Sequence, residues 1–571
     1  MNILYVLLCG VIGFWNKLEV SPLDKDISFT VLLPQQNVDI LEQTLLERAS
    51  PTSPTYAKWL STTEIDQIIA PKPYEPLTEW LREGGMTCTN HVDTLDCSGK
   101  VSQVNNLFTT TMVTYYNHDT NTYQESARHY GYSIPTYIEP HIDFILGLSD
   151  FPEMPPTTRV HPTLKPVQDT TPYITPESIY HLYNMSHYNH SSVSSQAVAE
   201  FLQDTCYSDD DLQSFLNDSN LPNMSVVLNE NWVNCDPTQT PYPDTEASLD
   251  IQYQAGVNSQ TQQYYVSVND WVFQFANRLY VAVDPPKVNS MSWGWAEWDQ
   301  CDPETMPQCL LNVSAKKYTK RTNVEFMKLS LRGVTLLASS GDAGAPGRTS
   351  EGCNAERPLN PAFPTSSPWV LSVGGTIIMK PTTITHPQTP LCKNNTCIRG
   401  GTELNCNIIR CGWTSGGGFS NFFHRPPWQV NVSEHYLQTS TLLPPKQYFN
   451  QLGRIYPDIS LVSHNFLIKT SGEYGAVDGT SASSPSVSGM ISILNNMRVS
   501  NNKTTLGPVA ALFYHMYVAC PDCFDDIIRG CNNSTEEAQC KYGYHAIKGF
   551  DAVYGLGVPN FDTIYEFIKN M

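Results

Sequence analysis

The hydrophobic and polar positions of the first 150 residues alternate in short segments. In some of them apolar residues recur at every second position, as in strands, and in others at intervals of three and four, as in helices. The strand-like segments are Ile27–Leu33, Thr87–Asp96 and Val113–Tyr130, and the helix-like segments are Val38–Leu46, Glu75–Glu83 and Val101–Phe108. This order, of the βαββαβ type, predicts a compact α+β domain with an antiparallel sheet.

Beyond residue 171, strand-like and helix-like segments alternate at longer intervals. Strands are expected at Gln196–Phe201, Val288–Trp293 and Val334–Ser339, and helices at Ala247–Gln254 and Val324–Leu331. Such alternation predicts an α/β domain in which a parallel sheet is flanked by helices on both faces. Binding and catalytic sites of these domains lie at the carboxyl ends of the strands.

Two segments lie outside these patterns. The apolar run Ile3–Phe14 is shorter than the roughly 20 residues that span a membrane, and it fits a secretory signal peptide over residues 1–16. A buried first strand is the alternative. Residues 151–170 are rich in proline and threonine, which is typical of an extended linker where proteases cut. The expected organisation is therefore a signal peptide (1–16), an N-terminal domain (17–150), a linker with a processing site (151–170) and a second domain (171–571).

The composition narrows the choice of partners and compartment. The 571 residues include 34 Lys and Arg against 55 Asp and Glu, which gives a net charge of −21. This balance argues against a nucleic-acid partner, because phosphate binding needs a basic patch, and no later apolar run is long enough for a membrane anchor. Ten Asn-x-Ser/Thr sequons, among them Asn217 and Asn532, indicate passage through a glycosylating lumen. A lysosomal or extracellular protein of the secretory pathway is expected.

The 16 cysteines are typical of disulfide bonds in a secreted chain. Cys88 and Cys97 are close enough in sequence to join the strands of a hairpin, and the loop Pro381–Cys411 holds four more cysteines. Cys520 and Cys523 have the spacing of a redox motif but follow a helix-like segment instead of opening one, which argues against redox chemistry. With one cysteine in the expected signal peptide, 15 remain, so at least one thiol is unpaired or joined to a partner.

The segment Gly479-Thr480-Ser481 precedes an apolar helix. Ser481 would lie at the helix N-terminus, where the amides and the helix dipole favour a developing negative charge. This suits a nucleophile, although a serine at that position is also an ordinary helix cap. A nucleophilic serine needs a base. The GTSxxxP pattern resembles subtilisin-like proteases, but the His-Gly-Thr segment that carries their base is missing here.

Carboxyl groups offer another base. Glu246 and Asp250 lie one helical turn apart on the same face, so they could share a proton, which would raise one pKa and suit work in acid. A solvated acidic helix face is the alternative. Asp342 directly follows the strand expected at Val334–Ser339. It could donate a hydrogen bond to an oxyanion if protonated, or it could simply belong to a turn.

These segments together resemble the sedolisin (serine-carboxyl peptidase) family, most closely its tripeptidyl-peptidase I branch. Further matches are Val373-Gly374-Gly375-Thr376 and Ser415-Gly416-Gly417-Gly418-Phe419-Ser420. The segment Ser53–Leu60 is similar to the pro-domain signature of that family. The resemblance covers almost the whole chain and implies a subtilisin-like catalytic domain behind a pro-domain.

The resemblance also implies a role for each candidate residue. Ser481 would be the nucleophile, Glu246 its general base and acid, Asp250 the carboxyl that orients Glu246, and Asp342 the oxyanion donor. An acid optimum follows, because Asp342 must carry a proton to donate and Glu246 must work near its own pKa.

One structural Ca²⁺ ion is implied near the C-terminus. The side chains of Asp526 and Asp551 and the main-chain oxygens of Ile527, Ile547 and Gly549 would bind it. Oxygen ligands of this kind suit Ca²⁺, which takes six to eight.

The expected activity is hydrolysis of peptide bonds in peptides or unfolded proteins. The pro-domain would inhibit the enzyme within the same molecule until self-processing near Lys165–Thr170. Release of tripeptides from free N-termini is the preferred specificity, and endopeptidase cleavage is the alternative. A catalytically inactive secreted glycoprotein is the alternative from a different class.

Overall fold

The computed structural model describes residues 15–117, 122–150, 165–167, 172–185, 192–201, 206–228, 235–240, 243–268, 271–300, 313–348, 359–533 and 540–571. They belong to two compact units. The first unit comprises residues up to 41, 62–159 and 298–318, and the second comprises 42–61, 160–297 and 319–571. The expected signal peptide lies outside the described residues except for Trp15 and Asn16, and the expected linker lies outside them except for residues 165–167.

The first unit contains two antiparallel sheets. One has the strand order β3-β4-β2-β7 and the other the order β1-β5-β6. The bounds are β1 (Trp15–Val20), β2 (Asp26–Leu32), β3 (Thr87–Asn90), β4 (Thr94–Lys100), β5 (Val113–Asn117), β6 (Thr122–Ser126) and β7 (Phe144–Leu146). The α+β class is as expected, but there are two sheets where the pattern predicted one.

Three helices belong to this unit, and they are α2 (Thr62–Ile69), α3 (Glu75–Glu83) and α4 (Val101–Leu107). Leu77 and Leu81 of α3 and Val104 of α4 are buried in the same core as Phe29 and Val31 of β2. The disulfide Cys88–Cys97 joins β3 to β4, which confirms the hairpin expected from the spacing.

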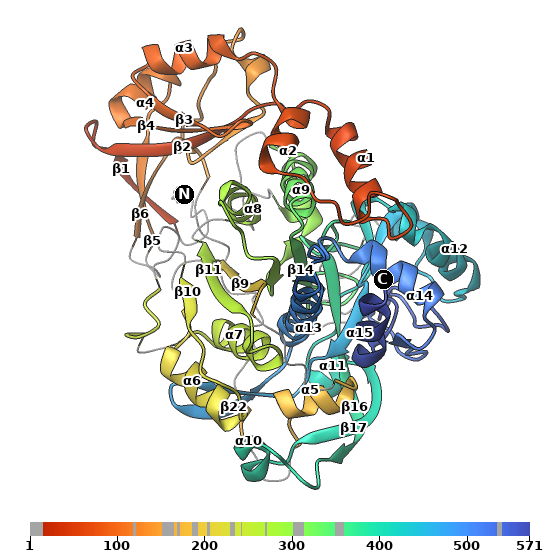
Figure 1. Ribbon diagram of the computed structural model, residues 1–571. Coiled ribbons are helices and arrows are strands. Elements are labelled where there is room, and N and C mark those ends of the chain that lie inside the picture. Colours follow the sequence, from red (N-terminus) through yellow and green to blue (C-terminus); the bar gives the residue numbers. More distant parts are fainter. Residues whose placement is uncertain are drawn as a thin grey trace, which may run out of the picture. The chain divides into compact units, whose positions relative to one another are not determined.

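The second unit is built on an eight-stranded sheet with the order β10-β11-β9-β12-β14-β16-β17, where β20 also pairs with β16 (Figure 1). All its pairs are parallel except β16 with β17. The bounds are β9 (Ser195–Phe201), β10 (Val226–Leu228), β11 (Gln262–Val268), β12 (Val288–Met291), β14 (Thr335–Ser339), β16 (Leu371–Thr383), β17 (Ile398–Asn405) and β20 (Ile459–Val462). The parallel sheet is therefore confirmed, with one antiparallel strand at its edge.

Shorter strands and the remaining helices surround this sheet. The strands are β8 (Lys165–Pro166), β13 (Trp295–Ala296), β15 (Ala362–Phe363), β18 (Gly418–His424), β19 (Gly453–Tyr456), β21 (Phe466–Thr470), β22 (Glu473–Val477), β23 (Phe524–Asp525) and β24 (Val558–Pro559). The helices are α5 (Pro176–Leu182), α6 (Asp209–Asp218), α7 (Thr245–Val257), α8 (Val272–Val281), α9 (Ala315–Leu331), α10 (Pro390–Asn394), α11 (Ile408–Cys411), α12 (Val430–Thr439), α13 (Thr480–Ser500), α14 (Ala510–Ala519) and α15 (Phe561–Lys569). Helix α1 (Val38–Ala49) runs across the boundary between the two units.

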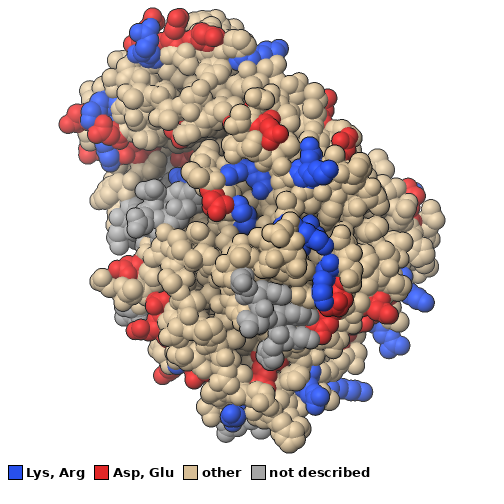
Figure 2. Space-filling model, viewed as in Figure 1, with Lys and Arg blue, Asp and Glu red and all other residues tan. Residues whose placement is uncertain are grey.

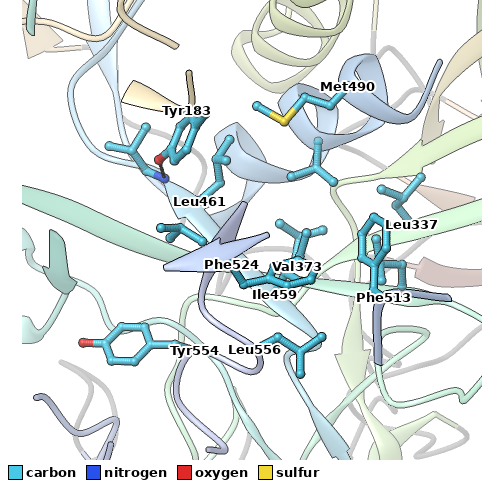
Figure 3. Packing of buried hydrophobic residues seen from close by; sticks show 14 of the residues in the cluster. Tyr183, Leu337, Val373, Ile459, Leu461, Met490, Phe513, Phe524, Tyr554 and Leu556 are labelled. Atoms are coloured by element: carbon cyan, nitrogen blue, oxygen red, sulfur yellow. Dashed lines mark hydrogen bonds between the residues drawn. The ribbon is translucent and has the colours of Figure 1, made fainter. Parts of the chain in front are cut away.

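Helix α13 is the central helix of the second unit. It contacts β12, β14, β16 and β20, and most of its residues are buried. Figure 3 shows Met490 of α13, Leu337 of β14, Val373 of β16 and Leu461 of β20 among the residues of one continuous core. Because the catalytic candidate Ser481 lies in the first turn of this helix, the same packing fixes the position of its backbone.

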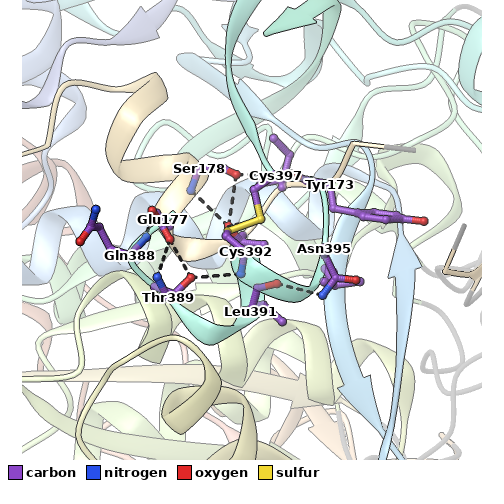
Figure 4. The surroundings of a disulfide bond; sticks show 12 residues. Tyr173, Glu177, Ser178, Gln388, Thr389, Leu391, Cys392, Asn395 and Cys397 are labelled. Carbon is purple, nitrogen blue, oxygen red and sulfur yellow. Dashed lines mark hydrogen bonds between the residues drawn. A yellow bond between two sulfur atoms is a disulfide. The ribbon is translucent and has the colours of Figure 1, made fainter. Parts of the chain in front are cut away.

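The hairpin of β16 and β17 holds the segment around Tyr173 and Glu177 in place. At its tip, the disulfide Cys392–Cys397 lies beside Tyr173, whose amide donates to the carbonyl of Thr396 at 2.8 Å (Figure 4). Glu177 of α5 accepts hydrogen bonds from the amide and hydroxyl of Thr389 at 3.0 and 2.6 Å. The cysteine-rich loop therefore anchors the chain just after the expected linker.

Further disulfides are Cys206–Cys235, Cys406–Cys411 and Cys520–Cys523. Within the described ranges, Cys531 is a free cysteine, in line with the expected odd thiol. Asn532 is fully buried, and its side chain bonds the backbone of Gly417, Ala552 and Tyr544. This sequon is therefore no surface acceptor for a glycan, and Asn217 lies in α6.

The segment that resembles a pro-domain signature belongs to the second unit. The indole nitrogen of Trp59 donates to the carbonyl of Thr505 at 2.8 Å, and the amide of Leu60 donates to Leu331 at 2.8 Å. A Cβ atom at Gly333 or Gly507 would lie 2.4 Å from the indole ring of Trp59. The absence of side chains at these two glycines leaves room for the indole.

Candidate active site

Ser481 lies in the first turn of α13 and is 6% exposed. The turn before it needs Gly479, whose φ is +128° and whose Cβ would lie 3.1 Å from a carboxyl oxygen of Asp342. Pro485, one turn into the helix, has no N–H to donate to the carbonyl oxygen of Ser481. That oxygen instead accepts a hydrogen bond from the hydroxyl of Ser292 at 3.3 Å.

Glu246 and Asp250 lie on α7 and are buried, at 3% and 0% exposure. The alternative of a solvated acidic face is therefore wrong. Asp244 begins the helix by accepting hydrogen bonds from the amides of Glu246 and Ala247 at 2.9 and 3.1 Å, as an N-cap residue does. Asp250 accepts a hydrogen bond from Ser292 at 2.9 Å, so one hydroxyl joins Asp250 to the backbone of the candidate nucleophile.

Helices α7 and α13 pack against each other, and the order of their hydrogen-bonded residues shows that they run in the same direction. Gln254 of α7 donates to Ser488 of α13 at 2.5 Å. One turn further, Asn258 donates to Ser492 at 2.7 Å. The helices can approach this closely because position 489 is a glycine, at which a Cβ would lie 2.8 Å from Val257.

The same register sets where Glu246 and Asp250 lie along the helix pair. Residues four apart lie on one face of a helix. Asp250, one turn before Gln254, is therefore level with Ser484, one turn before Ser488. A further turn back along both helices, Glu246 is expected to lie level with Thr480 and Ser481. The row of polar contacts therefore brings the acids of α7 and the nucleophile candidate of α13 to one end of the helix pair.

Asp342 follows β14 and faces Thr480. Its carboxylate accepts hydrogen bonds from the amide and the hydroxyl of Thr480, both at 2.8 Å. Desolvation raises the pKa of Asp342, and the nearby charge of Asp478 adds to this, while the Thr480 hydrogen bonds and Arg348 act in the opposite direction. A raised pKa keeps this carboxyl neutral to higher pH than an ordinary Asp, which is the state that can donate to an oxyanion.

The glycine-rich motif lies directly behind Asp342. The amide of Gly416 donates to the carbonyl of Gly341 at 2.7 Å, and the amide of Thr414 donates to that of Asp342 at 3.0 Å. A Cβ at Gly416 would lie 2.2 Å from the carbonyl oxygen of Ser340, so a larger residue would push the Asp342 loop away. The motif therefore supports the loop that carries Asp342.

Glu297 is a further buried carboxyl beside this motif. It is fully buried and accepts hydrogen bonds from the hydroxyl of Ser420 and, at 2.7 Å, from the amide of Asn421. Burial raises the pKa of Glu297 to about 7, against the lowering effect of these donors.

The sequence reasoning missed three residues at the carboxyl ends of neighbouring strands. Glu200 lies near the end of β9, and Ser292 and Trp293 directly follow β12. The indole of Trp293 donates to the carboxylate of Glu200 at 2.7 Å, and Glu200 is fully buried. Their position at the ends of parallel strands was the available signal.

Asp478, a fourth missed residue, precedes Gly479 and is 7% exposed. Its carboxylate pairs with the imidazole of His464 at 2.8 Å and with the ammonium of Lys165. Although desolvation acts to raise it, the pKa of Asp478 is lowered by His464, by the Asn465 amide and by Lys165. Two aspartates with opposite pKa shifts thus flank Gly479.

Asp526 and Asp551 come together, as the calcium hypothesis requires. Asp526 accepts from the amide of Gly549 at 2.7 Å, and Asp551 from that of Ile547 at 3.1 Å. Burial, with a contribution from the charge of Asp526, raises the pKa of Asp551 to about 8. A cation would remove the unfavourable free energy of two desolvated carboxylates, so these residues fit a Ca²⁺ site.

Another group with metal-binding geometry lies among the described residues. It consists of Cys406, Cys411 and His464, but the two cysteines form a disulfide, so their sulfur atoms are not available as thiolate ligands.

The chain is similar to known proteins along nearly its whole length. Residues 14–151 match the family described as "Pro-kumamolisin, activation domain". The chain is 35% identical to physarolisin of Physarum polycephalum over 594 residues, which cover 100% of this chain and 99% of that one. It is 29% identical to tripeptidyl-peptidase 1 of Homo sapiens, with 97% of this chain and 94% of the relative covered.

A solved structure shares the fold. It is the Pseudomonas sedolisin (serine-carboxyl proteinase) complexed with pseudo-iodotyrostatin, with a TM-score of 0.52 and 21% identity, covering 70% of this chain and 99% of that chain. The similarity to physarolisin along the whole chain and the shared sedolisin fold define a serine-type peptidase with a subtilisin-like core. The chain belongs to the sedolisin family, and its N-terminal region is an activation domain, so it is made as a zymogen.

Proposed function

We propose that this peptidase works in acid and releases tripeptides from free N-termini, with Ser481 as the nucleophile and Glu246 as its base. The observation that supports this most is the register of α7 and α13, which brings Glu246 level with Ser481. The name of the tripeptidyl-peptidase 1 relative supports the specificity.

In the proposed mechanism the Ser481 oxygen attacks the peptide carbonyl carbon while its proton passes to Glu246. Asp250, oriented by Ser292, holds Glu246 in place. The tetrahedral oxygen accepts a hydrogen bond from neutral Asp342. When the C–N bond breaks, Glu246 returns the proton to the leaving amine. Water then hydrolyses the Ser481 ester, again with Glu246 as the base.

A bound Ca²⁺ would be held by the side chains of Asp526 and Asp551 and the main-chain oxygens of Ile527, Ile547 and Gly549. The ion would stabilise the C-terminal loop and would take no part in the chemistry at Ser481. The residues of this loop already orient each other through the amides of Ile547 and Gly549.

The secretory pathway, with a lysosomal or extracellular destination and glycan-bearing sequons, is proposed as the compartment. The disulfides of both units support an oxidising environment. Among the helices that the structure describes, none is both long and apolar enough to cross a membrane. On the face in Figure 2, uncharged side chains predominate and acidic and basic groups are interspersed.

The test uses one long peptide with a free and with an acetylated N-terminus, incubated with self-processed enzyme at roughly pH 4. Mass spectrometry should show tripeptides released in sequence from the free peptide only. Internal fragments from both peptides would identify an endopeptidase. Processing that persists in a Ser481→Ala zymogen purified without other proteases would contradict the assigned nucleophile.

A further inference from the structure

The segment around the expected processing site is held on the strand that leads to the nucleophile. In the sheet β21-β22-β8, the short strand β8 is the outer strand. It pairs antiparallel with β22, with Lys165 opposite Ala476 and Pro166 opposite Gly475. Strand β22 ends at Val477, and Ser481 follows four residues later.

The side chain of Lys165 adds a charge contact to this pairing. Its ammonium group binds the carboxylate of Asp478, although Lys165 itself is 47% exposed. Asp478 is fixed from the other side by His464 and by the amide of Asn465 at 2.7 Å. A carboxylate that is held in place while a flexible lysine reaches it from solvent is a preformed site for a cation.

The surroundings of the site are suited to a positive partner. The titratable groups that face Asp478 are His464, Lys165 and Asp342. Because the pKa of Asp478 is lowered, this carboxyl stays mostly charged at the acid pH at which Asp342 is neutral.

Further acids lie along the same hairpin. Asp211 accepts from the amide of Gly472 at 2.8 Å, and Asp218 accepts from the hydroxyl of Tyr474 at 2.6 Å. Glu473 is exposed at the far end of β22. Lys469 of β21 lies 4.0 Å from Asp218, so charges of both signs surround this part of the hairpin, and Asp478 is the acid that contacts β8.

We propose that the outer edge of β22 and Asp478 form a substrate subsite that takes an extended peptide and places a cationic group on Asp478. Lys165 fills this subsite in the zymogen. When processing removes β8, β22 becomes an edge strand with free backbone groups, and a peptide can add to it as a strand does. The cation is either the free α-amino group of the substrate or a Lys or Arg side chain.

This inference rests on Ser481 being the nucleophile, since only then does the subsite lie next to the cleaved bond. Its test uses processed full-length enzyme and neutral peptides of one sequence in three forms. The first form has an acetylated N-terminus and the second has a free N-terminus. The third form is a set of acetylated peptides, each with a single lysine at a different position. Values of kcat/KM are measured at roughly pH 4.

Wild-type enzyme should prefer one cationic form over the acetylated neutral peptide by about fivefold, mainly through KM, as expected for one partly exposed ion pair. Asp478→Asn should remove this preference. Glu473→Gln, at the far end of the same strand, should retain it. The form that is preferred tells whether the α-amino group or a side chain is bound.

Equal preference in wild type and Asp478→Asn would overturn the proposal, as would a processed enzyme whose N-terminal peptide still contains Lys165. Absence of any wild-type peptidase activity would instead contradict the proposed function. A second measurement does not depend on activity. In a Ser481→Ala zymogen, the added substitution Lys165→Met should speed hydrogen exchange severalfold at the amide of Gly475 or Ala476 that faces β8, and unchanged exchange at both would contradict the occupancy by Lys165.

Discussion

The nucleophile end of α13 and the loop between Asp526 and Asp551 both bury aspartate carboxyls, but they stabilise them differently. Around Gly479, each acid has its own side-chain partner. Thr480 donates to Asp342, while His464 and Lys165 bind Asp478. In the C-terminal loop, the amides of residues 547, 553 and 554 donate to Asp551, and Asp526 lies nearby with the same charge.

The difference shows what a buried carboxyl can be used for. Around Gly479, burial raises the pKa of Asp342, while His464 and Lys165 act to lower that of Asp478. One acid can thus be neutral while its neighbour is charged, which is what acid catalysis with an oxyanion donor needs. Where backbone amides and a second acid surround the group, the carboxyl either holds a proton or, as we propose, is balanced by a bound cation. The first region is therefore expected to control rate and the second stability.

The sharpest way to separate the two regions is the substitution Ser481→Ala. Loss of the attacking oxygen should lower turnover by on the order of 10⁴-fold or more and should stop self-processing, while the melting temperature stays near that of the wild-type zymogen. Ser486→Ala is the matched control, because that hydroxyl is bonded within α13 to the carbonyl of Ala482. Turnover that survives in Ser481→Ala would remove the first region from the mechanism.

The next largest effect is expected at Asp342. Removing an oxyanion donor costs about 2.7–4 kcal/mol in comparable hydrolases, so Asp342→Ala should lose at least ~100-fold in kcat and remain folded. Asp342→Asn keeps a donor that does not titrate.

The two Asp342 variants should also differ in how their activity changes with pH. Because the pKa of Asp342 is raised, its neutral, donating form is present at low pH and is lost as the pH rises through that pKa. Asp342→Asn should therefore retain more activity than Asp342→Ala and lose the part of the alkaline decline that Asp342 causes. An unchanged alkaline decline in Asp342→Asn would exclude Asp342 as its source.

A smaller effect, on stability, is expected from calcium removal. An ion present at 100 times its dissociation constant stabilises the folded state by about 2.7 kcal/mol, so EGTA should lower the melting temperature by several degrees. Asp526→Asn should melt near the EGTA-treated wild type and respond little to EGTA. A melting curve of the wild type that EGTA does not change would remove the distinction between the two regions.

The smallest effect, when measured over one pH unit, concerns Glu297, a buried carboxyl outside both regions. Its pKa is raised to about 7, whereas an unfolded Glu titrates near ~4.3. Between these values the folded state holds a proton that the unfolded state lacks. The free energy of unfolding should therefore fall as pH rises, by at most about 1.4 kcal/mol per pH unit. Chemical denaturation of Glu297→Gln between these pH values should show a flatter dependence, and an equally steep one would assign the slope to other groups.

Local patterns predicted much of this structure. The helix expected at Glu75–Glu83 has these bounds in the structure, because its apolar spacing is clear and two glycines follow it. Strand β1 was missed, since Trp15 and Asn16 were assigned to the end of a signal peptide. The three residues of β7 are too few to show a period.

Some residues of the candidate site could likewise be predicted from local sequence, and others could not. Ser481 and Asp342 could be found from short motifs beside a helix and a strand, and the i, i+4 spacing of Glu246 and Asp250 is visible in one turn of sequence. Lys165 and Asp478 are 313 residues apart, and no local pattern connects them. Their contact depends on how β8 is placed on β22, which only tertiary structure determines.

Trp59 has a consequence for the lifetime of the enzyme. Its indole fills the space over Gly333 and Gly507 and belongs to a segment that maturation would discard. A mature molecule that unfolds would have to refold without the packing of Trp59 that was present when the zymogen folded. Its persistence would then rest more on the barrier to unfolding than that of the zymogen does.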